Sequence, residues 1–195
     1  MVEVDRRGAE RPVRIRAGSL CFALLLMLAC HTRPSEPANR LQIALAPSGF
    51  PERLNLQQHV HVQQAGHEID FEAVLDIAPD AVTLVGLSFG QRLFTMRYDG
   101  SRLEESRSPM LPREVHGRDI LSDIQLALWP TEAVRGALPA GWTLQDSTER
   151  RVLSKDGQEM TTISYDGSPR WKGLISLDNH QFGYRLVIRS APSEP

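Results

Sequence analysis

Apolar and polar residues alternate along three segments of the chain, 71–77, 92–98 and 182–189. Every second side chain in each segment is apolar, and the residues between them are mostly polar or charged. A period of two is typical of antiparallel strands that bury one face and expose the other. The residues predicted to share buried faces are Phe71, Ala73, Leu75, Ile77, Phe94, Met96, Tyr98, Phe182, Tyr184, Leu186 and Ile188.

Turn signals fall between these segments. Asp-Gly pairs stand at 99–100, 156–157 and 166–167, and residues 178–180 form a fourth polar break. Asp-Gly supplies the positive φ values that tight hairpins require, so each pair is expected to join two neighbouring strands. The alternation begins near Leu54 and predicts a meander of about nine to ten strands.

One segment in the middle of the chain has a helical period instead. Residues 119–128 carry an apolar stripe with Asp119 in the first turn, where an acidic side chain favours a helix start, and Pro130 ends the helix. A second short helix is predicted over 131–138, with Thr131 as its cap and Pro139 after it. The stripe consists of Ile120, Leu121, Ile124, Ala127 and Leu128.

Two short helices offer little cover for so long a sheet, which must bury its apolar face. We therefore predict a mostly β (α+β) fold, a curled antiparallel sheet or open half-barrel with a helical lid inserted centrally. A slot between sheet and lid would suit an apolar ligand. Each candidate side chain could equally be ordinary core. The candidates are Phe71, Leu75, Phe94, Met96, Tyr98, Trp129, Phe182, Tyr184 and Leu186.

The first 30 residues have the organisation of a secretory signal. Five arginines precede the uncharged run 20–30, which is about half the ~20 residues a membrane-spanning helix needs. Leu28-Ala29-Cys30 resembles the lipobox of bacterial lipoproteins. That resemblance implies cleavage after residue 29 and acylation of Cys30. We expect a signal peptide at 1–29, a lipidated cysteine with a polar tether at 30–40, and one domain at 41–195.

The order of lipobox, tether, strands, central helices and terminal strands resembles the LolA/LolB-like class. Within it, the chain is most similar to a little-characterised family of outer-membrane lipoproteins often associated with aryl-polyene and related lipid biosynthesis genes. The segments that carry the match are 90–100, 123–130 and 183–186. The resemblance implies an acyl-chain, lipoprotein or polyene-lipid ligand. Because His31 rather than Asp follows Cys30, it also implies an outer-membrane location facing the periplasm.

Composition and the remaining polar residues limit the other functions that the chain could have. Without residues 1–29 the chain keeps 17 basic and 21 acidic residues, a formal charge of −4, which argues against nucleic acid. His59 and His61 share a strand face near His67 and could bind a metal, but a solvated polar face is the favoured interpretation. Glu104, Glu105, Asp119 and Asp123 are also interpreted as solvated. No catalytic motif occurs, so we expect no catalysis and no cofactor. We also expect the protein to be a monomer. The alternative function is a scaffold with a filled core that acts through its surface.

Overall fold

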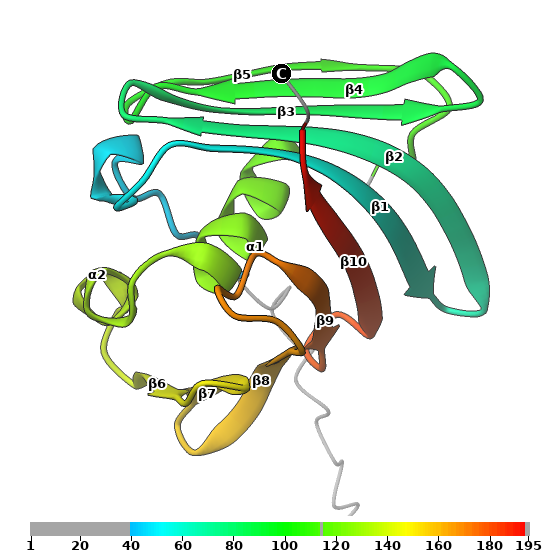
Figure 1. Cartoon of the computed structure of the whole chain (residues 1–195). Helices are drawn as coiled ribbons and strands as arrows, with labels where there is room; N and C mark the ends of the chain where they lie inside the picture. Colours follow the sequence, from blue (N-terminus) through cyan, green and yellow to red (C-terminus); the bar gives the residue numbers. More distant parts are fainter. Residues whose placement is uncertain (1–39, 114, 194–195) are drawn as a thin grey trace, which may run out of the picture. The chain divides into compact units, whose positions relative to one another are not determined.

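The computed structural model describes residues 40–113 and 115–193 and contains one antiparallel sheet with two short helices (Figure 1). The predicted signal peptide, Cys30 and the tether up to residue 39 lie outside the described residues. The strands are β1 (Leu54–Gln64), β2 (His67–Ala78), β3 (Ala81–Ser88), β4 (Gln91–Tyr98), β5 (Leu103–Arg107), β6 (Trp142–Asp146), β7 (Arg150–Lys155), β8 (Gln158–Tyr165), β9 (Gly173–Asn179) and β10 (Tyr184–Pro192). The helices are α1 (Gly117–Leu128) and α2 (Thr131–Ala137), preceded by a 3₁₀ turn, η1 (Pro47–Gly49).

The sheet has the strand order β5-β4-β3-β2-β1-β10-β9-β8-β7-β6. Two meanders therefore meet where β1 pairs with β10, and β5 and β6 remain as open edges. The helices come between β5 and β6 in the chain, and α1 crosses the concave side of the sheet (Figure 1). The predicted curled, open sheet with a central helical lid is confirmed.

The register assigns each strand a buried and an exposed face. On β1, Leu56 and Val60 are buried, whereas His59 and His61 lie on the opposite face. The pairing places His59 beside Glu72 of β2 and Arg189 of β10. The period of two in the sequence therefore corresponds directly to the inner and outer faces of the sheet.

Each of the three Asp-Gly pairs lies between two strands that pair with each other, as predicted. Asp156 and Gly157 both have positive φ between β7 and β8. At the turn after β4, the backbone amides of Arg102 and Ser101 donate to the Asp99 carboxylate, which lowers the pKa of Asp99 to about 2. The third pair, at 166–167, also joins two neighbouring strands, since β8 pairs with β9, but through a longer connection over 166–172 rather than a tight turn.

The second helix is capped differently from the prediction. Thr131 lies inside α2, Pro130 is its N-cap, and no side chain caps this end. The Thr131 hydroxyl donates instead to the Asp146 carboxylate. That bond ties α2 to the edge strand β6.

The core lies between α1 and the concave face. Its fully buried members include Leu56, Ile77, Met96, Leu121 and Trp129. All elements and core residues of the described part of the chain lie after residue 40, so the chain from His31 onward contains the sheet and the core described above. No helix among the described residues is long and apolar enough to cross a membrane.

Candidate functional site

A cavity of about 1400 Å³ lies between α1 and the inner face of the sheet. The apolar stripe of α1 forms its helical wall through Ile120, Ile124, Ala127 and Leu128. The opposite wall comes from inward-facing side chains of the central strands: Val60, Val62, Phe71, Leu75, Leu186 and Ile188. The volume exceeds the roughly 300–1,000 Å³ of common small-molecule pockets.

Six of the nine predicted site residues line this cavity: Phe71, Leu75, Phe94, Phe182, Tyr184 and Leu186. Met96 and Trp129 are fully buried in the core and do not line it. Tyr98 also lies outside the lining, with its hydroxyl 3.2 Å from the carbonyl oxygen of Ala44 and 2.9 Å from that of Gly100.

A segment before β1 explains why those three residues are covered by protein. Residues 41–46 run beside α1, and η1 follows against β2 and β3. Trp129 packs on Phe50, with ring centroids 5.1 Å apart. This part of the inner face is therefore filled by the chain itself.

Two buried polar side chains of α1 bind that segment. The Ser122 hydroxyl accepts from the Ile43 amide at 3.0 Å. The Gln125 side chain accepts from the Leu45 amide at 2.7 Å and donates to the Leu45 carbonyl at 2.8 Å. Because Gln125 is fully buried, both ends of its amide require partners, and Leu45 supplies them.

The C-terminal end of α1 is held by side chains from β7 and β8. Arg151 is 1 % exposed and donates to the carbonyl oxygens of Leu126 at 2.6 Å and Trp129 at 3.1 Å. The Tyr165 hydroxyl donates to the carbonyl of Ala127 at 2.8 Å. Burial raises the pKa of Tyr165 to about 12. These bonds satisfy carbonyls that a helix end leaves without partners.

Asp146 balances the charge of Arg151. Its carboxylate lies 3.0 Å from Arg151 and 2.6 Å from Arg170. Burial alone would raise the pKa of Asp146, but hydrogen bonds from Arg151, Arg170 and Thr131 outweigh burial and hold that pKa well below its ordinary value. The lid is thus attached to the sheet by a charged network.

A second cluster of charged side chains forms around Asp119 and Asp123 of α1. Arg40 donates to Asp123 at 2.8 Å and to the Tyr184 hydroxyl, and its Nε is 3.5 Å from Asp119. The guanidinium also lies 5.3 Å from the ring centroid of Phe182. Burial raises the pKa of Asp123, and the charge of Arg40 opposes that rise. Through Arg40, these contacts join α1 to β10 and to the loop before β10, where Phe182 lies.

The interpretation of Asp119 and Asp123 as solvated was wrong. Their side chains are only 16 % and 15 % exposed, because Arg40 and Tyr184 cover them. Glu105 is also engaged, since its carboxylate accepts from the Gly117 amide at 2.6 Å and anchors the start of α1. The sequence did contain a signal for the two aspartates. Asp119 and Asp123 are four residues apart and border the apolar stripe, so they lie on the same side of the helix.

Aromatic packing shapes the wall on β2–β4. The Phe94 ring lies over Gly86, where an added Cβ would be 2.3 Å from Cε1 of the ring. Phe71 meets Phe94 edge to face, with centroids 6.0 Å apart. Gly86 is therefore required to seat Phe94 in the cavity wall.

The histidines of β1 lie outside the cavity. His59 is 2.8 Å from Glu72, and His61 is 2.9 Å from Asp70. The hydrogen bond to Glu72 raises the pKa of His59. His67 lines the cavity instead. Residues 40–113 and 115–193 hold no group of three or more His, Cys, Asp or Glu side chains arranged for a metal.

Comparison with known families places residues 55–192 in the family described as "Protein of unknown function (DUF3261)". The chain belongs to this family. A search of curated proteins found no match. The crystal structure of a DUF1329 family protein from Desulfovibrio piger is similar over 72% of this chain and 85% of that chain, at 8% identity and a TM-score of 0.25.

Proposed function

We propose that this protein is a non-catalytic lipid-binding lipoprotein of the outer membrane. Cys30 would carry the lipid anchor, and the cavity beneath α1 would hold an acyl chain of a lipid or lipoprotein, or a polyene lipid. The observation that carries the proposal is an apolar cavity of about 1400 Å³ between the lid and the sheet. A cavity of that size favours a binding protein over a scaffold with a filled core.

The distribution of charge supports an apolar ligand. The Arg40–Asp123 pair and the Arg151–Asp146 pair are each engaged in bonds that hold α1. Arg40 and Asp123 line the cavity but are paired with each other, and α1 also presents Ile120, Ile124 and other apolar side chains to it. Apolar surface on both walls stabilises a hydrocarbon chain by about 25 cal/mol for each Å² removed from water.

A pair of adjacent residues on β10 tests the site. Leu186 faces the cavity, whereas Val187 lies on the outer face opposite His61 and Ser176. Leu186→Glu should abolish uptake of a fluorescent fatty acid by the chain from His31 onward, because the carboxylate would face hydrocarbon. Val187→Glu should leave uptake close to wild type.

Two controls complete this test. Circular dichroism should show both variants folded before fluorescence is compared. Equal uptake by the two variants, or no uptake by the wild type with any acyl probe, would contradict binding in this cavity.

The anchor is tested separately. Cys30→Ala should release the protein from the membrane fraction, since stable anchoring needs more than one acyl chain and this variant would carry none. A variant that still sediments with the outer membrane would refute the proposed role of Cys30.

A further inference from the structure

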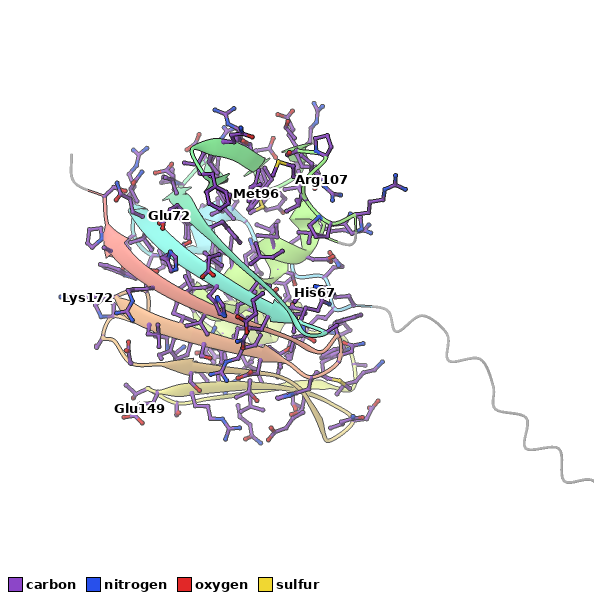
Figure 2. The ribbon with its side chains drawn as sticks, turned by 90° about the vertical axis from the view of Figure 1, so that its right-hand side faces the viewer. His67, Glu72, Met96, Arg107, Glu149 and Lys172 are labelled. Atoms are coloured by element: carbon purple, nitrogen blue, oxygen red, sulfur yellow. The ribbon has the colours of Figure 1, made fainter. Side chains whose placement is uncertain are left out.

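The cavity has an accessible end and a closed end. Where the β1–β2 hairpin lines it, His67 and Glu68 are exposed. Further along the strands, the lining residues Leu75 and Ile175 are buried. Figure 2 shows His67 and Lys172 at opposite ends of the central strands, and Lys172 directly precedes β9. The cavity therefore opens at the β1–β2 hairpin and closes toward the start of β9.

The charged cluster around Arg40 lies toward the accessible end. Tyr184 is opposite Gln64 in the pairing of β10 with β1, and its hydroxyl donates to Asp123 at 2.7 Å. Arg40 contacts Asp123 and Asp119 of the same cluster. A charged head group of a bound lipid would therefore find its partners near the hairpin end.

One polar side chain of the lining lies far from this cluster. Gln58 lines the cavity from the inner face of β1 and is only 7 % exposed. It precedes Gln64 by six residues, which is about 20 Å at ~3.4 Å per residue of strand. Gln58 is opposite Ser190 of β10, and Ser190 pairs with Gly173, the first residue of β9. Gln58 is thus a polar residue at the closed end.

The lining around Gln58 is apolar. Val60 is the next residue on the same face of β1, and Ala73 pairs with Gln58 on β2. The charged side chains that line the cavity in the described part of the chain belong to the Arg40 cluster, the β1–β2 hairpin or the start of α1. An amide among apolar side chains costs free energy unless it has hydrogen-bond partners.

The fold satisfies the Gln58 amide only in part. Its Nε2 donates to the Ser190 hydroxyl at 3.0 Å, and this is the one hydrogen bond that its side chain makes within residues 40–113 and 115–193. The amide oxygen is not enclosed by protein, unlike Thr95 Oγ1 and Ser193 Oγ, so it is accessible from the cavity. Gln125, in contrast, uses both ends of its amide within the fold. One N–H donor and the oxygen of Gln58 remain for a ligand.

We propose that Gln58 recognises a hydroxyl group at the inner end of the bound chain. A hydroxyl both donates and accepts, so it matches the oxygen and the N–H that Gln58 has left. A charged terminus fits less well, because the charged lining residues are at other parts of the cavity.

The length of the cavity suits such a ligand. The distance of about 20 Å from Gln64 to Gln58 is close to the length of one acyl chain, since two layers of chains form the ~30 Å hydrocarbon core of a bilayer. The inference rests on the proposed function and names its ligand class: a hydrocarbon chain with its head group at the accessible end and a hydroxyl at the far end.

Competition between two fatty acids tests this specificity. A fluorescent fatty acid bound to the chain from His31 onward is displaced with hexadecanoic acid or with 16-hydroxyhexadecanoic acid. The wild type should bind the hydroxy acid about tenfold more tightly, because only that ligand supplies a partner to the buried amide. Gln58→Leu should abolish this preference and bind hexadecanoic acid at least as tightly as the wild type does.

The adjacent glutamine provides the matched control. Gln57 is exposed on the outer face of β1, so Gln57→Leu should keep the wild-type preference. Circular dichroism checks that each variant folds. If Gln58→Leu alone does not fold, combining it with Ser190→Ala replaces both members of the polar pair by apolar groups, which restores folding at little cost. The double variant should show the same loss of preference.

The outcomes separate this inference from the proposed function. Equal affinity of the wild type for the two acids, or an unchanged preference in Gln58→Leu, would overturn the role of Gln58 and leave the lipid-binding cavity intact. Equal weakening of both acids by Gln58→Leu would also overturn it, because the hydroxyl would then not be the group recognised. Failure of the wild type to bind any of the three fatty acids would contradict both.

Discussion

The arginine beneath the end of α1 provides the sharpest stability prediction. Arg151 is 1 % exposed, pairs with Asp146 at 3.0 Å and donates to the backbone carbonyls of Leu126 and Trp129. Arg151→Met keeps most of the side-chain volume but removes the charge and the donors. The carbonyls and one side of Asp146 would then be buried without partners.

The expected cost follows from these contacts. Removing one partner of a buried ion pair costs about 3–5 kcal/mol, of a total stability near 5–15 kcal/mol. Arg170 still reaches Asp146 at 2.6 Å, which keeps the loss from exceeding that range. With a urea slope of roughly 2 kcal/mol per M, the midpoint should fall by about 2 M.

Urea unfolding followed by tryptophan fluorescence measures this shift. Arg150→Met is the matched control, because the neighbouring Arg150 is 54 % exposed and its pair with Glu159 is 3.6 Å long. It should change stability by no more than about 0.5 kcal/mol. If Arg151→Met matched this control, the claim that Arg151 holds the lid to the sheet would be refuted.

Two further substitutions test the packing and charge of the domain. Gly86→Ala should cost about 1–3 kcal/mol in urea unfolding because its Cβ would meet the Phe94 ring at 2.3 Å, whereas Gly136→Ala, with nothing within 4 Å in α2, should be neutral or stabilising. The lowered pKa of Asp146 contributes stability above its unfolded pKa of about 3.9, and this is lost as the pH falls. Asp146→Asn should therefore be less stable at neutral pH and lose less on acidification; an unchanged acid dependence would contradict that role.

The alternation of apolar residues predicted the strands and the face that each one buries. Phe71 and Leu186 could be assigned to the inner face because a strand's side chains point alternately to its two sides. A helix was predicted over 119–128 because its apolar stripe has a different period and Pro130 follows it; α1 begins earlier, at Gly117. These signals come from residues that are close together in the chain, so a single sequence is enough to detect them.

The attachments of the lid could not be predicted, because they join residues far apart in the chain. Arg40 meets Asp123 and Tyr184 only when β10 lies beside β1, and Arg151 meets Leu126 only when β7 crosses under α1. Likewise, Met96 shares a predicted face with Phe94 but is covered by core, whereas Phe94 reaches the cavity. Periodicity identifies the buried face and does not distinguish core from cavity wall.

The most direct test of a lipid-binding cavity is native mass spectrometry of the chain from His31 onward, purified from bacterial cells and followed by organic extraction. We predict a co-purifying fatty acid, phospholipid or polyene lipid that is present in Val187→Glu and absent from Leu186→Glu. A mass that corresponds to protein alone, before and after incubation with envelope lipids, would contradict the account.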